Sequence, residues 1–234
     1  MKIKKILLKI SGEHFGGDVK TGINFDILRT ISSEIFDIAH QGFEISIVVG
    51  GGNIYRGSSA KENGIEREKA DYIGMLATVI NALSLSEFLK RLDLKVEVMS
   101  SIGIPGICDH FDIDTAKSYL QNGHIMIFAA GTGNPYFSTD TAAILKALEM
   151  NVDAIIKCTK VDGVYSDDPV KNPNAEFFKE LSYDDVLAKN LGIMDLPAIS
   201  LAKVNNMPII VGSIKTHGNI LKILRGEGKY SIIR

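Results

Sequence analysis

Six short apolar runs alternate with longer segments of helical periodicity, and this alternation limits the possible folds more than any other feature of the chain. Several runs are apolar at consecutive positions, as expected for strands that are buried on both faces. Such strands, separated by helices, predict an α/β fold: a three-layer α/β/α sandwich around a mainly parallel sheet. The predicted strands are 4–10, 44–49, 95–100, 125–130, 154–159 and 208–213.

The segments between these runs have apolar residues three or four positions apart, which predicts helices with one buried face. The clearest is 24–40, where Asn24 or Asp26 is suited to cap the start and Gly42 lies where a C-terminal cap belongs. The other predicted helices are 66–92, 112–122, 138–150, 182–190, 195–206 and 217–225.

The chain has 234 residues, of which 45% are hydrophobic, and this is enough for one large core. We therefore predict a single domain over 1–234. The stretch 161–181 interrupts the alternation with Asp162-Gly163, a dipeptide typical of hairpin turns, and with two later Asp-Pro and Asn-Pro steps. It is predicted to form a hairpin and a long surface loop on the same domain.

Composition argues against several classes of protein. A formal net charge of −2 argues against an extended nucleic-acid surface. The N-terminal apolar run is only Ile6 to Leu8, too short for a secretory leader, and no window approaches the roughly 20 apolar residues of a membrane span. Cys108 and Cys158 lie far apart without further metal-ligand patterns, so we expect two reduced thiols. These observations predict a cytoplasmic protein with no nucleic-acid or membrane partner.

Three glycine-rich stretches lie at the ends of predicted strands, at 9–17, 50–53 and 131–143. Ligands of open parallel sheets bind at the carboxyl ends of the strands, and glycines let backbone N–H groups approach an anion closely. Each loop alone is more often a structural turn. Because Lys9 and Arg56 accompany the loops, the three together predict a phosphate-rich ligand.

Four carboxylates have alternative interpretations. Asp140 lies in the first turn of its helix and suits the helix dipole, but Ser138 or Thr139 can cap equally well, which leaves Asp140 free to face the ligand crevice. Asp71 lies either on a solvated helix face or at the border of a buried surface. Asp162 and Asp168 can serve simply as turn formers.

The chain resembles the bacterial UMP kinases of the amino-acid kinase superfamily in six motifs: KISG, VVGGGNIYRG, DYIGMLATVINAL, AGTGNPYFSTDTAA, KCTKVDGVYSDDP and IMDLPAISLA. The similarity extends from Lys5 to about Val211. It implies an amino-acid kinase-like fold and transfer of the ATP γ-phosphoryl group to UMP in pyrimidine nucleotide biosynthesis, with Mg²⁺ bound to ATP. It also implies a homohexamer, for which the helix from Met75 to Leu92 is an interface candidate and, alternatively, an ordinary core helix.

The resemblance assigns site residues as well. The implied catalytic residues are Lys9, Arg56 and Asp140. The implied ATP-binding residues are Lys9, Ile10, Ser11, Gly12, Gly52, Arg56, Thr159, Tyr165 and Asp168. The implied UMP-binding residues are Gly51, Asp71, Thr132, Gly133, Asn134, Pro135, Tyr136, Phe137, Ser138 and Thr139. No residue is implied as a metal ligand. Segment 12–26 resembles the GTP-responsive region of the family only loosely, so no effector is predicted.

This assignment of ATP-binding and UMP-binding residues agrees with the chemistry of phosphoryl transfer, which depends on in-line positioning and charge stabilisation. A phosphate nucleophile is already ionised at neutral pH, so no general base is needed, and Asp140 is expected to orient lysines or Mg²⁺. Lys157 is a second candidate phosphate contact. Asp195 either supports the site or caps a helix.

Three other functions compete with this one. A kinase of the same superfamily that phosphorylates a carboxylate or carbamate would not need Asp71 and the 132–139 loop for a nucleotide acceptor. A nucleotide-sensing module would not need Lys9, Arg56 and Asp140 around a transferred phosphate. A dehydrogenase that uses NAD is disfavoured because no GxGxxG follows the first predicted strand.

Overall fold

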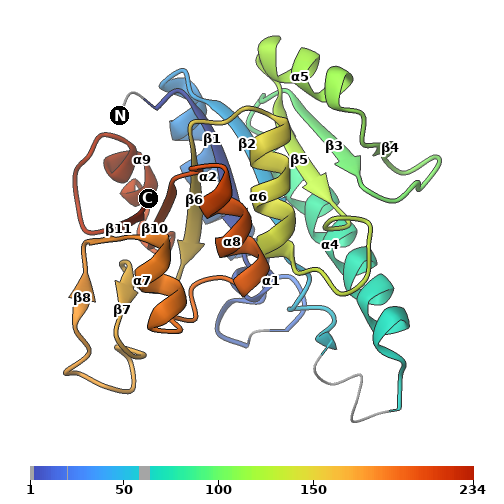
Figure 1. Cartoon of the computed structure of the whole chain (residues 1–234). Coiled ribbons are helices and arrows are strands. Elements are labelled where there is room, and N and C mark those ends of the chain that lie inside the picture. The colour runs from blue at the N-terminus through green and yellow to red at the C-terminus, as the bar shows by residue number, and fades with distance from the viewer. Residues whose placement is uncertain (1–2, 20, 58–63) are drawn as a thin grey trace.

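The computed structural model describes residues 3–19, 21–57 and 64–234. In these residues a nine-stranded sheet has the order β4-β3-β5-β2-β1-β6-β10-β11-β9 (Figure 1). The pairs are parallel except for β11, which runs antiparallel to β10. The strands are β1 (Lys5–Ile10), β2 (Glu44–Val49), β3 (Val96–Ser100), β4 (Asp109–His110), β5 (Ile125–Ala129), β6 (Ala154–Thr159), β9 (Glu180–Leu181), β10 (Ile209–Ser213) and β11 (Ser231–Ile233). All six predicted strands are confirmed.

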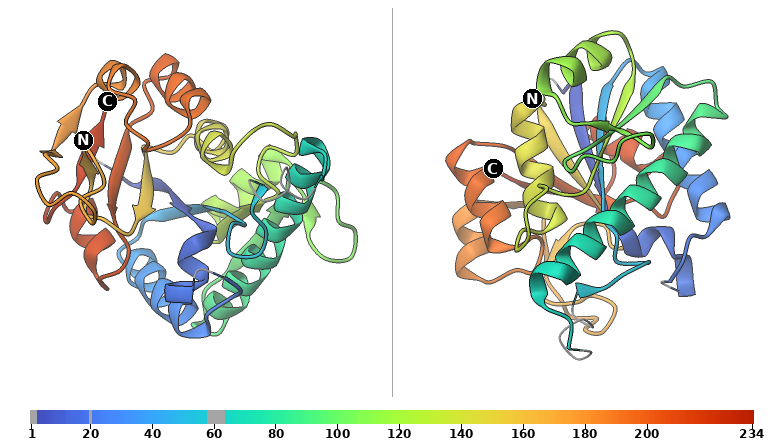
Figure 2. Two further views of the ribbon diagram at one scale, coloured as in Figure 1. Left: turned by 90° about the horizontal axis from the view of Figure 1, so that it is seen from below. Right: turned by 90° about the vertical axis from the view of Figure 1, so that its right-hand side faces the viewer.

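Helices cover both faces of the sheet, which confirms the three-layer sandwich (Figure 2). Helices α2 (Phe25–His40), α4 (Arg67–Lys90) and α9 (Asn219–Leu224) pack on one face. Helices α5 (Ile113–Gln121), α6 (Thr139–Glu149), α7 (Tyr183–Ala188) and α8 (Leu196–Val204) pack on the other. Successive strand residues alternate between the two cores: Leu8 of β1 faces the α2 and α4 side, and Leu7 faces the α6 side.

Side-chain caps fix the helix boundaries that the sequence indicated. The side chain of Asn24, not that of Asp26, accepts hydrogen bonds from the first turn of α2, and Gly42 follows the helix with a φ of 80°. At α6 the cap is Ser138, which accepts from the backbone N–H groups of Asp140 and Thr141. Because Ser138 does the capping, the carboxylate of Asp140 remains available for other contacts.

Helix α4 corrects one expectation from composition. Its most apolar 18-residue window has a mean hydropathy of 1.4, so by length and composition alone it qualifies as a membrane span, contrary to the prediction that no window does. Half of that window is buried inside the protein, where Leu85 and Leu89 join the core. The opposite side exposes Ile73, Leu76 and Ile80. Helix α4 is therefore a core helix with an apolar outer face.

The predicted hairpin exists, but its turn lies elsewhere. Strands β7 (Val164–Tyr165) and β8 (Phe177–Phe178) pair antiparallel, and the connection between them is 166–176. The dipeptide Asp162-Gly163 precedes β7, so its interpretation as a hairpin turn was wrong. Gly163 is required by packing: a Cβ there would lie 2.5 Å from Oγ of Ser231. The short elements α1 (Gly12–Phe15), η1 (Gly17–Val19), β4 and β9 had no periodic signal in the sequence.

Candidate active site

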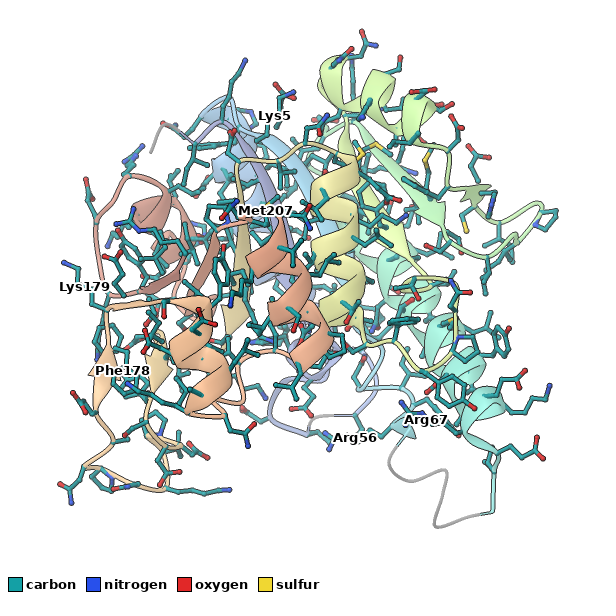
Figure 3. The ribbon with its side chains drawn as sticks, viewed as in Figure 1. Lys5, Arg56, Arg67, Phe178, Lys179 and Met207 are labelled. Carbon is teal, nitrogen blue, oxygen red and sulfur yellow. The ribbon has the colours of Figure 1, made fainter. Side chains whose placement is uncertain are left out.

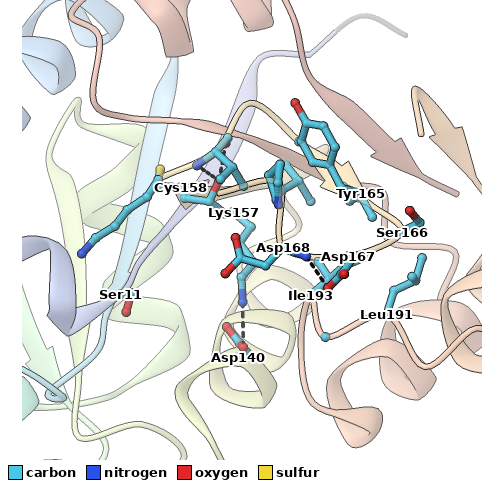
Figure 4. Close-up of a pocket in the computed structure, with 18 of the residues that line it drawn as sticks. Ser11, Asp140, Lys157, Cys158, Tyr165, Ser166, Asp167, Asp168, Leu191 and Ile193 are labelled. Carbon is cyan, nitrogen blue, oxygen red and sulfur yellow. Dashed lines mark hydrogen bonds and ion pairs between the residues drawn. The ribbon is translucent and has the colours of Figure 1, made fainter. Parts of the chain in front are cut away.

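Two lysines and one aspartate form a compact charged cluster at the carboxyl ends of neighbouring strands. Lys9 on β1 and Lys157 on β6 are register partners. Nζ of Lys9 lies 2.7 Å from Oδ1 of Asp140, and Nζ of Lys157 donates to Oδ2 of the same carboxylate at 2.8 Å (Figure 4). Asp140 thus binds both ammonium groups at once.

The fold places the three side chains together through strand alternation and helix capping. Leu7 and Ile155 lie two residues before the lysines on their strands, and both belong to the core on the α6 side of the sheet. Lys9 and Lys157 therefore point toward α6, where Asp140 lies in the first turn. Lys9 was predicted from its place at a strand end, and Asp140 from its place after a capping residue.

Burial makes the charges of this cluster interact strongly. Burial raises the pKa of the Asp140 carboxyl, but the ammonium groups of Lys9 and Lys157 outweigh this effect and hold the pKa below its ordinary value. Burial and the neighbouring charge of Lys9 lower the pKa of Lys157, against the opposing effect of Asp140. Two cations and one anion leave an excess of positive charge, which suits a multiply charged phosphate ligand.

A cavity of about 670 Å³ opens over this cluster, and we call it the charged cavity. It contains five of the residues implied for ATP: Lys9, Ser11, Thr159, Tyr165 and Asp168. Figure 4 shows Tyr165, Asp168, Leu191 and Ile193 among the residues that line it. Glu13 and His14, within the 9–17 loop, also line the cavity, as does the segment 189–193, to which no site residue was assigned from the sequence.

A second cavity, of about 170 Å³, lies beside the glycine-rich loops, and we call it the glycine cavity. Of the residues implied for UMP, it is lined by Gly51, Asp71, Thr132, Phe137, Ser138 and Thr139. Gly52, implied for ATP, also faces this cavity. Because Thr139 lines the glycine cavity and the next residue, Asp140, lines the charged cavity, the start of α6 borders both cavities.

Asp71 links α4 to the loop that follows β5. Both of its carboxylate oxygens lie 3.0 Å from Nε of Arg67, and Oδ2 accepts a hydrogen bond from the backbone N–H of Tyr136 at 2.7 Å. The guanidinium of Arg67 lies over the ring of Tyr136, 5.7 Å from its centroid. Asp71 therefore borders the cavity and does not lie on a purely solvated helix face.

Arg56 does not reach either cavity in this structure. Its Nη2 lies 2.9 Å from Oε1 of Glu13, and its Nε donates to the carbonyl of Gly52 at 3.3 Å. Figure 3 shows Arg56 and Arg67 at the same lower end of the molecule. Glu13 lines the charged cavity, so its partner Arg56 lies at the border of that cavity.

The remaining implied residues contribute backbone or lie at the rim. The side chain of Ile10 is fully buried in the core, so only its backbone is available to a ligand. Gly12 packs so closely on the second glycine loop that a Cβ would lie 2.4 Å from the backbone nitrogen of Gly52. The rim residues Gly133, Asn134, Pro135 and Tyr136 belong to the loop but not to the described lining of the glycine cavity.

Asp195 joins two helices and does not cap its own. It occupies the N-cap position of α8 but makes no capping hydrogen bond. Its carboxylate instead accepts a hydrogen bond from the hydroxyl of Thr141 at 3.1 Å, which joins the starts of α6 and α8.

Neither cysteine is paired, as predicted. Cys158 borders the charged cavity, and burial raises the pKa of its thiol to about 12, so it carries no thiolate at neutral pH. The described residues contain no group of three or more metal-binding side chains. At the charged cluster the one central carboxylate already binds two lysines, so a protein-held metal cage does not fit there.

Comparison with known proteins agrees with this geometry. A model of the amino acid kinase family matches residues 4–213. A uridylate kinase of Rickettsia bellii (strain RML369-C) is 47% identical over 233 residues, which span 100% of this chain and 98% of that protein.

Solved structures give the same result. A UMP kinase from Bacillus anthracis has a TM-score of 0.96 and 38% identity, covering 100% of this chain and 97% of its own. A UMP kinase from Ureaplasma parvum has a TM-score of 0.93 and 36% identity, covering 100% of this chain and 99% of its own. These alignments therefore span the residues that line both cavities.

Proposed function

The chain belongs to the amino acid kinase family, and we propose that it transfers the γ-phosphoryl group of ATP to UMP, forming UDP and ADP for pyrimidine nucleotide biosynthesis. The observation that carries the proposal is that the start of α6, at Thr139 and Asp140, borders both cavities directly beside Lys9 and Lys157. Relatives named uridylate kinase and UMP kinase match over the full chain, which supports UMP as the acceptor.

In this proposal ATP occupies the charged cavity and UMP the glycine cavity. Tyr165 and Asp168 receive the adenosine end of ATP, and its phosphates lie over Lys9 and Lys157. Backbone N–H groups of the 131–138 loop hold the monophosphate of UMP, and Asp71 contacts its nucleoside. Arg56 contacts Glu13 of the 9–17 loop and Gly52 of the 50–53 loop. In this proposal Arg56 leaves Glu13 and pairs with the phosphate that is transferred.

The transfer itself requires positioning and charge stabilisation. An ionised phosphate oxygen of UMP attacks the γ-phosphorus in line, and the bond from that phosphorus to the oxygen it shares with the β-phosphate breaks. Negative charge on the migrating group and on the leaving ADP is stabilised by Lys9 and Lys157. Asp140 keeps both ammonium groups in place and accepts no proton from the substrate.

Mg²⁺ enters this scheme bound to ATP. Magnesium ions in such sites are held mainly by substrate phosphates and water, with one or two protein carboxylates. Bound with ATP, the ion would neutralise charge on the phosphates. Asp140, the carboxylate beside Lys9 and Lys157, would be the residue to orient it.

Assembly, domain structure and location complete the proposal. The exposed face of α4, with Ile73, Leu76 and Ile80, supplies an apolar surface for contact between subunits of a homohexamer. One sheet joins the N-terminal and C-terminal strands, in support of a single domain over 1–234. Two free thiols suit a reducing cytoplasm.

An ADP-release assay with ATP and Mg²⁺ tests the function. The purified protein is offered UMP, CMP, AMP, glutamate and aspartate in turn, and we expect UMP to give the highest kcat/KM. Turnover of an amino acid without turnover of UMP would identify another kinase of the family. Binding of ATP and UMP without ADP formation would favour a nucleotide sensor.

A further inference from the structure

Helix α4 carries three buried polar side chains that are not among the site residues implied by the sequence, and two of them, Thr78 and Asn81, bind loops of the site. Thr78 and Asn81 lie three positions apart and therefore on the same side of the helix. Their exposed fractions are 2% and 0%. Polar groups buried this deeply are normally hydrogen-bonded, so the partners of the two side chains indicate their role.

Thr78 holds the start of the loop that follows β5. Its hydroxyl donates to the carbonyl of Met75 at 2.7 Å and accepts from the backbone N–H of Ala130, also at 2.7 Å. Ala130 has a φ of 61°, in the left-handed region that a Cβ disfavours, and Gly131 follows with a φ of 56°. The hydroxyl therefore fixes an unfavourable backbone turn, from which the 131–138 loop departs.

Asn81 holds the loop after β2. Its amide nitrogen donates to the carbonyl of Gly50 and to Oδ1 of Asn53, at 2.7 Å in each case. Its own Oδ1 accepts from the amide of Asn53 at 3.0 Å. The amide of Asn53 also contacts the carbonyl of Gly22 at 2.7 Å. Both ends of the 50–53 loop are thus bound to one side chain of α4.

The 50–53 loop lies between the two cavities. Gly51 and Gly52 line the glycine cavity, and a Cβ on Gly50 would lie 2.7 Å from the backbone nitrogen of Gly12, which follows Ser11 of the charged cavity. A shift of this loop therefore changes both cavities. A shift of the 131–138 loop changes the glycine cavity, which Thr132 and Phe137 line.

We propose that Thr78 and Asn81 are positioning residues of the phosphoryl-transfer site. Thr78 sets the place of the 131–138 loop, and Asn81 sets the place of the 50–53 loop. Because both project from one turn of a rigid helix, they keep the two loops at a fixed separation across the point of transfer. The inference rests on the proposed kinase function and adds to it two residues whose hydrogen bonds go to the loops and to α4. Thr78 also borders the glycine cavity, but its hydroxyl is already bonded to Met75 and Ala130.

Steady-state kinetics with ATP and UMP separate this role from a purely structural one. Thr78→Val keeps the shape of the side chain without its hydroxyl. We expect the KM for UMP to rise roughly tenfold, the KM for ATP to change by less than about twofold, and Thr78→Ser to restore the wild-type value. Asn81→Leu removes every hydrogen bond to the 50–53 loop, so the KM values for both substrates rise and kcat falls.

Two further variants complete the experiment. Asn81→Ser replaces the amide with a smaller side chain that carries a hydroxyl, so it tests the same contact if Asn81→Leu does not fold. The KM for ATP of this variant is also expected to rise. Ser86→Ala is the matched control, because Ser86 is equally buried on α4 and its hydroxyl has no hydrogen-bond partner in the described structure. Its kinetic constants are expected to equal those of the wild type.

The outcomes are distinct. Variants that lose only thermal stability, with wild-type KM values in the folded enzyme, would overturn the positioning role and leave the kinase function intact. The positioning role would also be overturned if Thr78→Val changed the KM for ATP as much as the KM for UMP. A wild-type protein without ADP formation from UMP would overturn the proposed function and this inference with it.

Discussion

The charged cavity and the glycine cavity are built from different parts of the chain. In the charged cavity, the side chains of Lys9, Lys157 and Asp140 are already paired before any ligand is bound. The glycine cavity is lined by glycines and by mostly uncharged side chains, and its one carboxylate, Asp71, is bound to Arg67 and to the backbone of Tyr136. The difference indicates that the first cavity supplies charge stabilisation and the second supplies shape. Substitutions in the charged cavity should therefore lower kcat, and substitutions in the glycine cavity should raise the KM for UMP.

The largest effect is expected from Lys9→Met, which removes one of the two buried ammonium groups and keeps the length of the side chain. We expect kcat to fall by about two to three orders of magnitude, as for the loss of one transition-state donor in other enzymes. The far-ultraviolet circular dichroism spectrum should be unchanged. Initial rates of ADP formation at saturating ATP and UMP measure the effect.

Lys4→Met is the matched control for this substitution. Lys4 precedes the same strand, but its side chain is exposed and lies 3.7 Å from Glu44. Its kcat should equal that of the wild type. An unchanged kcat for Lys9→Met would remove Lys9 from the mechanism and would leave the two cavities without the contrast described above.

An intermediate effect is expected in the glycine cavity from Asp71→Asn. The substitution removes the charge that binds Arg67 and weakens the hydrogen bond to Tyr136. Because charge-assisted hydrogen bonds contribute about 1.5–3 kcal/mol, the KM for UMP should rise about tenfold or more. The KM for ATP and kcat should stay near wild type.

Glu68→Gln, on the exposed first turn of α4, is the control for helix stability, since Glu68 contacts only Lys69 in the described structure. If Asp71→Asn lowered kcat and left the KM for UMP unchanged, the glycine cavity would take part in charge stabilisation. The proposed contrast between the cavities would then be wrong.

Sequence patterns predicted the parts of the site that depend on local rules. Lys9 follows from its place at the end of a buried strand, and ligand sites lie at such ends. Asp140 follows from its place two residues after a capping serine. Glycines mark the loops because the backbone there turns sharply or, at Gly12, approaches another chain segment too closely for a Cβ.

The parts that were missed depend on contacts between distant segments. Thr78 and Asn81 look like ordinary polar positions of a mixed helix until Ala130 and Gly50 pack against them. Arg56 was expected among phosphates, but its pairing with Glu13 depends on how α1 meets the 50–53 loop. Composition also could not show that α4, apolar enough for a membrane, is half buried in the core.

The smallest effect is expected from Lys229, another residue that sequence patterns did not indicate. It lies after α9, yet its Nζ donates to the hydroxyl of Tyr165 at 2.7 Å and lies 4.7 Å from the ring centroid of Phe177. These contacts hold Tyr165 at the outer wall of the charged cavity, away from the transferring phosphate. The residue should therefore affect the affinity for ATP and not the rate.

For Lys229→Met we expect the KM for ATP to rise about threefold, the size of an exposed cation–π contact, with kcat and the KM for UMP unchanged. Lys203→Met is the matched control, because Lys203 pairs with Asp184 and lines neither cavity. Kinetics at varied ATP concentration measure the difference. A fall in kcat for Lys229→Met would mean that the wall of the charged cavity also orients the phosphates of ATP. The position of Tyr165 would then affect the rate of phosphoryl transfer at Lys9 and Lys157.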